Sequence, residues 1–254
     1  HPCWVACREM EQLHPTHVAE VDAYEAHRPP SGTASWLRVN MVSSLDGHIV
    51  DDDGVSGGLG GDADRSAFFA LRHHADAILA GAGTVRAENY GGMRVRDSMR
   101  AAREADGRVD PAPIVVVTAS LDLDPTSRLF TDTRVPPIVL TTIDADAGAV
   151  ERLSGAGARI VRAGEGRVDL TAGLAVLRDA LGLNHVLCEG GPGLNAALLA
   201  ADLVDELCLT LAPAIVGSDD PRRIAGEAHP ARGMTLTRVL HQDGELLLRY
   251  TRQR

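Results

Sequence analysis

The sequence predicts an α/β protein built on a mixed, mostly parallel central sheet with helices on both faces. Short apolar runs rich in Val, Ile and Leu alternate with helix-like segments along most of the 254 residues. Two of these runs, ending at Ala80 and Cys188, lead through glycine turns directly into helices, as is typical of parallel sheets. The last third carries two apolar runs separated by a Gly- and Pro-rich stretch, which predicts antiparallel strands there.

The first half of the chain predicts the following elements. Residues 1–30 are expected to be a poorly ordered extension that ends in a linker at Arg28–Thr33, so that the domain proper covers residues 31–254. A strand at Ser35–Val42, a helix at Asp62–His74 and a strand at Ala75–Ala80 follow. The glycine turn Gly81–Val85 enters a second helix, and residues 86–108 form an arginine-rich connection.

The second half continues the alternation. We expect short buried strands at 114–118, 138–142, 159–162 and 185–188, and helices at 151–157, 170–181 and from about Leu194. Residues 206–213 and 244–251 are the two late strands.

Composition excludes several functions. The formal charge of −10 makes nucleic acid an unlikely class of partner, and no apolar run is long enough to span a bilayer. All 25 cationic residues are arginine, which excludes a Schiff-base lysine and the lysine of a P-loop. We therefore expect a small-molecule ligand, with no nucleic acid and no membrane.

The four cysteines, Cys3, Cys7, Cys188 and Cys208, are too scattered for a disulfide framework and favour a reducing, cytoplasmic location. Cys3 and Cys7 lie near several histidines, but their spacing is not that of a common zinc site. We expect no metal.

Three strand ends, Ser43–Gly47, Gly81–Val85 and Glu189–Gly193, are expected to meet at one crevice if their strands are neighbours. Two of them carry glycines that open helices, whose amide groups bind phosphate. Plain strand-to-helix packing explains a single such turn equally well, but two together favour a dinucleotide. Asp46 and Glu189 supply carboxylates to the crevice, although Asp46 is also a common turn residue before Gly47.

Arginines crowd residues 65–103, which favours a small anionic ligand. Arg72 lies on the helix beside the crevice and is the candidate for a phosphate contact. Arg100 and Arg103 are expected in a polar loop, where a solvated surface is an equal explanation.

Three segments carry a resemblance to a known family: VNMVSSLDG at 39–47, AGAGTVRAE at 80–88, and CEGGPGL at 188–194 followed by LVDEL at 203–207. Together they resemble the reductase domain of bacterial riboflavin biosynthesis, which has the dihydrofolate reductase fold, over residues 35–251. The resemblance implies that NADPH reduces 5-amino-6-(5-phosphoribosylamino)uracil to its ribitylamino product. It also implies that residues 31–254 are an NADP-dependent reductase domain.

The same resemblance implies roles for individual residues. Asp46 would lie beside the reacting carbon as the catalytic residue, and Ser56, Arg72 and Glu189 would bind substrate. The implied cofactor-binding residues are Val42, Gly58, Gly81, Gly83, Thr84, Glu88, Thr118, Gly190, Gly191, Pro192, Gly193, Leu194 and Asn195.

Departures from the family pattern keep other functions open. Only Pro2, Cys3 and Cys7 are left of a deaminase signature, so we expect no deaminase activity. The glycine run 57–61 opens the substrate wall, and Tyr90 replaces part of a proline-containing turn. These changes resemble stand-alone actinobacterial reductases for which dihydrofolate reduction has been suggested, so a pteridine is the alternative substrate. A third possibility is an NADP-binding protein without turnover.

Family members commonly form homodimers through their late strands. The apolar segments Leu207–Ile215 and Leu246–Leu248 are candidates for that surface, and a place in the core is an equal explanation.

Overall fold

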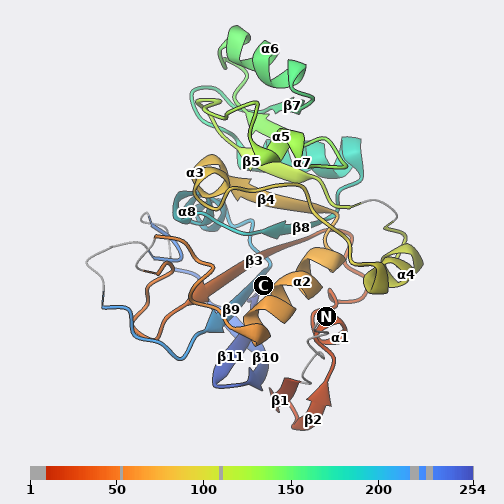
Figure 1. Cartoon of the computed structure of the whole chain (residues 1–254), viewed down its shortest axis with the longest axis vertical. Helices are drawn as coiled ribbons and strands as arrows, with labels where there is room; N and C mark the ends of the chain where they lie inside the picture. The colour runs from red at the N-terminus through yellow and green to blue at the C-terminus, as the bar shows by residue number, and fades with distance from the viewer. Residues whose placement is uncertain (1–9, 52–53, 109–110, 218–222, 227–230, 254) are drawn as a thin grey trace, which may run out of the picture.

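A computed structural model describes residues 10–51, 54–108, 111–217, 223–226 and 231–253. Within these residues the chain forms one eleven-stranded sheet in the order β2-β1-β10-β11-β9-β3-β8-β4-β5-β6-β7 (Figure 1). The strands are β1 (Met10–His14), β2 (Val18–Val21), β3 (Trp36–Ser43), β4 (Ala77–Gly81), β5 (Ile114–Val117), β6 (Ile138–Thr141), β7 (Arg159–Arg162), β8 (His185–Cys188), β9 (Glu206–Leu211), β10 (Met234–Gln242) and β11 (Glu245–Arg252). The helices are α1 (Ala23–Ala26), α2 (Asp62–His74), α3 (Ala82–Ala87), α4 (Asp97–Ala105), α5 (Arg128–Thr131), α6 (Ala147–Gly155), α7 (Leu170–Leu181) and α8 (Pro192–Ala200).

The sheet has a parallel part and an antiparallel end. All pairs from β9 through β3, β8, β4, β5 and β6 to β7 are parallel, whereas β2, β1, β10, β11 and β9 pair in antiparallel fashion. Because β3, β8 and β4 are parallel neighbours, their carboxyl ends lie at one edge of the sheet. The expected meeting of three strand ends is confirmed at the level of topology.

Alternate residues of the parallel strands face two different cores. Leu79 and Val115 belong to a cluster that includes side chains of α7 and α8, whereas Ile78 and Val116 belong to a cluster with α3, α5 and α6. Helices therefore cover both faces of the sheet, as predicted from the continuous apolar strands.

The prediction for residues 1–30 is wrong for the part that the structure describes. Residues 10–21 form β1 and β2, and β1 pairs with β10 with Gln12 opposite Leu240. Met10 is 1% exposed and packs into a small core with Leu240 and Leu247. Little in the sequence indicates these strands, because β1 is short and polar and its partner β10 falls in the stretch that was predicted to separate the two late strands.

A buried ion pair holds the following linker against the sheet. The guanidinium of Arg38 on β3 lies 2.8 Å from the carboxylate of Glu206 on β9, and both side chains are almost fully buried. Arg38 also donates to the carbonyl oxygens of His27 at 2.5 Å and Arg28 at 3.0 Å. The Arg38 charge is thus compensated by Glu206, and its remaining N–H groups satisfy two backbone carbonyls. These contacts fix the start of the linker, which the sequence predicted to be poorly ordered.

The connection 86–108 also contains structure that was not expected. Its α4 covers Asp97–Ala105, and Arg103, which was expected in a polar loop, is 2% exposed. Its guanidinium donates to the carbonyl oxygens of His73 at 2.7 Å and Ala75 at 3.1 Å. Arg103 therefore satisfies carbonyl groups at the end of α2, a role that local sequence does not reveal.

None of the described helices is long and apolar enough to cross a membrane. The described residues also contain no cluster of three or more His, Cys, Asp or Glu side chains able to hold a metal ion. Cys3 and Cys7, which prompted the metal question, lie outside the described residues.

Candidate active site

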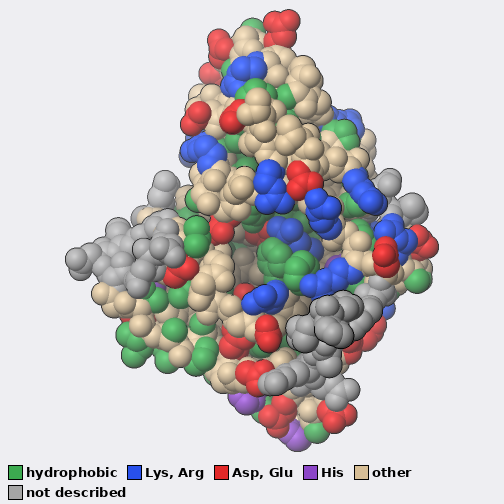
Figure 2. Space-filling model, viewed as in Figure 1, with side chains coloured by type: hydrophobic (Ala, Val, Ile, Leu, Met, Phe, Trp, Pro, Cys, Tyr) green, Lys and Arg blue, Asp and Glu red, His purple; other side chains and the backbone are tan. Residues whose placement is uncertain are grey.

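A cavity of about 1010 Å³ lies where the strand ends of β3, β4 and β8 meet α2. Figure 2 shows this face of the molecule, on which a hollow with hydrophobic side chains is bordered by Lys and Arg side chains; since the chain has no lysine, these are arginines. Twelve predicted site residues line the cavity: Val42, Ser56, Arg72, Gly81, Gly83, Thr84, Glu88, Glu189, Gly191, Pro192, Gly193 and Leu194.

One side of the cavity is a groove between two strand-to-helix turns. The β4–α3 turn supplies Gly81 and Thr84, and the β8–α8 turn supplies Gly191. The amide of Gly81 donates to the carbonyl oxygen of Gly190 at 2.8 Å, which ties the turns together. A Cβ on Gly191 would lie 2.6 Å from the hydroxyl oxygen of Thr84, so the close approach requires glycine.

The start of α8 is suited to an anion. Gly191 is its N-cap, Pro192 follows without an N–H, and no side chain caps the helix. The amide groups of Gly193 and Leu194 have no partner within the helix, because they belong to its first turn. A phosphate of a dinucleotide placed in this groove would accept from these groups and meet the positive end of the helix dipole. The groove therefore fits the expected pyrophosphate.

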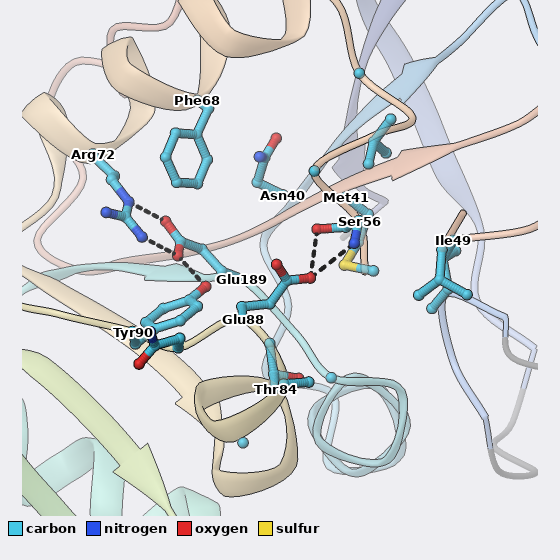
Figure 3. Close-up of a pocket in the computed structure, with 18 of the residues that line it drawn as sticks. Asn40, Met41, Ile49, Ser56, Phe68, Arg72, Thr84, Glu88, Tyr90 and Glu189 are labelled. Atoms are coloured by element: carbon cyan, nitrogen blue, oxygen red, sulfur yellow. Dashed lines mark hydrogen bonds and ion pairs between the residues drawn. The ribbon is translucent and has the colours of Figure 1, made fainter. Parts of the chain in front are cut away.

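The opposite wall carries a network of three polar side chains (Figure 3). Arg72 on α2 donates from Nε and Nη2 to the two carboxylate oxygens of Glu189, both at 2.7 Å. The hydroxyl of Tyr90 donates to Oε2 of Glu189 at 2.6 Å. Burial and the neighbouring carboxylate raise the pKa of Tyr90 well above its usual value, so the phenol keeps its proton.

The same network changes the interpretation of Arg72. Burial alone would lower the pKa of Arg72, but Glu189 more than offsets that effect and the net pKa is raised. The guanidinium also lies over the ring of Phe68, 4.2 Å from its centroid. The structure thus places Arg72 in the cavity but pairs it with Glu189, rather than leaving its charge free for a phosphate.

A second polar contact holds the loop that precedes α2. Both the amide and the hydroxyl of Ser56 donate to Oε1 of Glu88, at 2.8 and 2.9 Å (Figure 3). Glu88 is the C-cap residue of α3, so this contact connects the loop to the groove between the two turns. The two residues had been assigned to different ligands, and the structure places them in direct contact.

Asp46 does not line the cavity. Its carboxylate accepts from the hydroxyl of Ser44 at 2.5 Å and from the amides of Gly217 at 2.8 Å and Val216 at 3.2 Å, and His48 lies 3.2 Å away. The Ser44 hydroxyl and the amide groups lower the pKa of Asp46. In this structure Asp46 joins the turn after β3 to the loop after β9.

Four other predicted residues also lie off the cavity surface: Gly58, Thr118, Gly190 and Asn195. The hydroxyl of Thr118 accepts from the amide of Leu121, and the fully buried Asn195 donates to the carbonyl oxygen of Ile224 at 2.7 Å. Gly190, at a φ of +90°, shapes the turn behind the groove. Of the four, Gly190 and Asn195 belong to the β8–α8 turn and helix and shape the groove without lining it.

Sequence reasoning missed several residues of the cavity. Asn40, Asp64 and Phe68 all line it. A polar residue in a buried strand was a usable signal for Asn40, whereas Asp64 was masked by the ordinary preference of helix first turns for acidic residues. Arg94 and Arg128 line the mouth of the cavity and share one carboxylate, that of Asp132, at 2.5 and 2.9 Å.

Comparisons with known proteins agree with this geometry. A 2,5-diamino-6-ribosylamino-4(3H)-pyrimidinone 5′-phosphate reductase of Methanothermobacter thermautotrophicus is 29% identical over 221 residues, which cover 85% of this chain and 97% of that protein. A reductase of the same name from Archaeoglobus fulgidus is 30% identical over 197 residues, 76% of this chain and 87% of its own.

The solved structure of a pyrimidine reductase-like protein from Corynebacterium diphtheriae matches with a TM-score of 0.80 and 27% identity, and covers 92% of this chain and 100% of its own. The predicted dihydrofolate reductase-like arrangement of sheet and helices is confirmed. A family model described as the RibD C-terminal domain matches residues 35–248, and the chain belongs to that family.

Proposed function

We propose that this protein is an NADPH-dependent reductase of riboflavin biosynthesis that converts a 6-(5-phosphoribosylamino)pyrimidine to its ribitylamino form. The 5-amino uracil predicted from the sequence is one member of this substrate class. The observation that carries the proposal is one continuous cavity in which the groove at the start of α8 adjoins a wall of arginine, carboxylate and aromatic side chains. Its volume of about 1010 Å³ is at the upper end for ligand pockets, which suits two ligands side by side.

The chain's contribution to the reaction is mainly placement. When bound, the reduced nicotinamide supplies the hydride that C1′ of the opened ribose accepts. The β4–α3 and β8–α8 turns would hold the pyrophosphate, while Arg72, Glu189 and Tyr90 form a rigid wall for the pyrimidine. Positioning two reactants within one site accounts for a large part of such catalysis. Asp46 is not assigned a catalytic role in this proposal, because its carboxylate is occupied away from the cavity.

The arginines at the mouth supply the counter-charge for the substrate phosphate. Arg94 and Arg128 face one carboxylate, so the three groups together carry a net charge of about +1 at neutral pH. Both guanidinium groups are exposed at the cavity mouth, where a phosphate would have access to them. We assign the phosphate contact to Arg94 and Arg128 instead of Arg72.

A reduced pteridine is the second candidate substrate. Gly57, Gly60 and Gly61 line the cavity in front of α2, and Phe68 offers an aromatic face beside them. An open wall with an aromatic face accommodates a bicyclic ring as well as a pyrimidine.

The test is NADPH oxidation followed at 340 nm with the phosphoribosylaminopyrimidines and dihydrofolate in parallel, each repeated with NADH. We expect turnover of a phosphoribosylaminopyrimidine with NADPH. Turnover of dihydrofolate alone would contradict the proposal and show that the substrate is a pteridine. NADPH binding without oxidation in any arm would leave a cofactor-binding protein.

We further propose a homodimer formed by the antiparallel end of the sheet. Leu209 and Leu211 of β9 lie opposite Leu248 and Leu246 of β11, so the four side chains share one face, and all are only half-buried. Half-buried leucines on one sheet face favour a subunit contact over a simple core. Sedimentation of the wild type and of Leu209→Asp tests this, with a dimer that dissociates in the variant as the expected result. A cytoplasmic location is proposed as well, because Cys188 and Cys208 are both free thiols.

A further inference from the structure

Three carboxylates line the cavity within the described residues: Asp64, Glu88 and Glu189. Glu189 takes three hydrogen bonds from Arg72 and Tyr90, so its charge is compensated and most of its acceptor sites are used. Glu88 holds the Ser56 loop through Oε1. Asp64 differs from both, because its carboxylate forms neither an ion pair nor a hydrogen bond to the loop.

Asp64 is the third residue of α2, yet it does not cap that helix. The amides of Gly61, Ala63 and Asp64 itself donate to the carboxylate of Glu245, which is buried and reaches the helix start from β11. An acidic residue in a first helical turn usually accepts hydrogen bonds from the free amides there. At the start of α2 the carboxylate of Glu245 already does this.

The carboxylate of Asp64 is instead held toward the cavity from behind. The buried hydroxyl of Thr210 on β9 donates to it, and the carboxylate packs closely against Gly60, where a side chain would collide with it. Burial raises the pKa of Asp64, and the nearby Glu245 adds to that effect. One hydrogen bond from Thr210 leaves several of its acceptor sites open to a ligand.

A partly buried carboxylate with open acceptor sites is best matched by two adjacent N–H donors, which it binds in bidentate fashion. A 2-aminopyrimidin-4-one ring offers such a pair in its ring N3–H and its 2-amino group. Uracil has a carbonyl oxygen at C2 instead, and that oxygen would face the carboxylate with lone pair against lone pair. Uracil's other donor pair, N1–H and the 6-amino N–H, adjoins the ribose and belongs at the end of the ring that faces the cofactor groove.

We infer that Asp64 binds the C2 edge of the substrate ring through hydrogen bonds. The protein therefore acts on a heterocycle with a 2-amino-4-oxo edge in preference to a uracil. This inference rests on the proposed reductase function and narrows its substrate class. Two kinds of molecule share the edge, a 2,5-diamino-6-(ribosylamino)pyrimidin-4-one 5′-phosphate and a reduced pterin. The mouth arginines Arg94 and Arg128 favour the phosphorylated pyrimidine of the two.

The experiment compares two substrates that differ only at C2, the 2,5-diamino pyrimidinone and the 5-amino uracil, both as ribosylamino 5′-phosphates. Wild-type kcat/KM with NADPH should be at least about tenfold higher for the 2-amino compound, because an unmatched buried polar group penalises the other. The Asp64→Asn variant replaces one acceptor by an NH₂ donor, which matches the N3–H and C2 oxygen of uracil. Its ratio of the two kcat/KM values should fall at least about tenfold toward the uracil, mainly through KM.

Asp62→Asn is the matched control. Asp62 lies one half-turn earlier on α2, pairs with Arg65 at the surface and does not line the cavity, so the ratio should stay at the wild-type value. Calorimetric binding of the two ribitylamino products gives a readout that does not depend on turnover, and the wild-type comparison stands even if Asp64→Asn fails to fold.

The outcomes separate the inference from the proposed function. A wild type that prefers the uracil, or a ratio unchanged in a folded Asp64→Asn, overturns the role of Asp64 while the reductase function stands. Failure to reduce either pyrimidine overturns the proposed function itself. In that case, turnover of dihydrofolate that is lost in Asp64→Asn would assign the same edge recognition to a pterin.

Discussion

Arg72 and Glu189 form a two-point ion pair that links α2 to the end of β8 across the cavity wall. Both N–O distances are 2.7 Å, and the side chains are 16% and 4% exposed. A pair with this geometry and burial has a different consequence from a surface salt bridge, because removing one partner leaves the other charged and desolvated.

Arg72→Ala should therefore destabilise the fold as well as the site. We expect the free energy of unfolding to fall by about 3 kcal/mol, because the Glu189 carboxylate loses its counter-charge. Urea unfolding measures this, and Arg65→Ala, an exposed arginine on the same helix, should change the value by less than about 0.5 kcal/mol. Adding Glu189→Gln to Arg72→Ala should recover part of the loss; a fully additive double variant would contradict the pairing.

Much of the parallel half of the fold could be predicted because its signals are local. The helices 62–74 and 170–181 and the strands 159–162 and 185–188 have the predicted bounds, since apolar periodicity and glycine turns define them. The antiparallel end depends on distant partners. Neither β1 nor β10 is strongly patterned, and each is held in the sheet by two neighbours: β10 pairs with β11 and β1, and β1 pairs with β10 and β2.

The site divides in a similar way. Cavity residues that lie at strand ends and offer backbone groups, such as Gly191, could be located from the turn pattern alone. Residues that act through side chains depend on how distant elements pack. Asp46 lies at the expected strand end, but its carboxylate accepts hydrogen bonds from the amides of Val216 and Gly217 and so connects two loops. By sequence Asp64 resembles any acidic residue in a first helical turn, whereas in the structure Glu245 accepts the hydrogen bonds of the helix start.

The cofactor groove should respond to a single methyl group at Gly191. In Gly191→Ala the new Cβ would meet the Thr84 hydroxyl at 2.6 Å and push the two turns apart. We expect the Kd for NADPH to rise at least about tenfold, measured by calorimetry. Gly155→Ala is the control, because Gly155 lies on α6 outside the cavity and a Cβ there meets nothing within 4 Å. Equal losses in both variants would show that the groove does not depend on this close approach.

The mouth arginines should recognise the phosphate rather than the ring. Substituting both Arg94 and Arg128 by Ala should raise KM for the phosphorylated substrate about tenfold or more and leave kcat within about threefold, since the charge lies far from the transferred hydride. The same variant should treat the dephosphorylated substrate as the wild type does. Arg86→Ala removes an exposed arginine outside the cavity and should change neither value. A loss that is equal for both substrates would assign the two arginines to something other than the phosphate.

Two buried histidines should make the N-terminal part of the fold sensitive to acid. His27 and His74 both contact α1, through the carbonyl oxygens of Ala23 at 2.7 Å and Tyr24 at 2.8 Å. Burial lowers the pKa of each to about 4, against about 6.5 in the unfolded chain. Between pH 4 and pH 6.5 the unfolded state thus binds more protons than the folded state. The contribution of these histidines to the free energy of unfolding is therefore fully present above about pH 6.5 and is lost as the pH falls toward about 4.

Each histidine accounts for up to about 3 kcal/mol of this loss, because a shift of one pKa unit corresponds to about 1.4 kcal/mol. Urea unfolding at pH 7.5, 6.0 and 5.0 measures the slope of the free energy of unfolding against pH, above the range in which most carboxylates titrate. His27→Leu should flatten it, because an apolar side chain fills the site without a proton to gain, whereas the exposed His17→Gln should keep the wild-type slope. If His27→Leu folds and keeps the full slope, the acid sensitivity arises elsewhere in the chain.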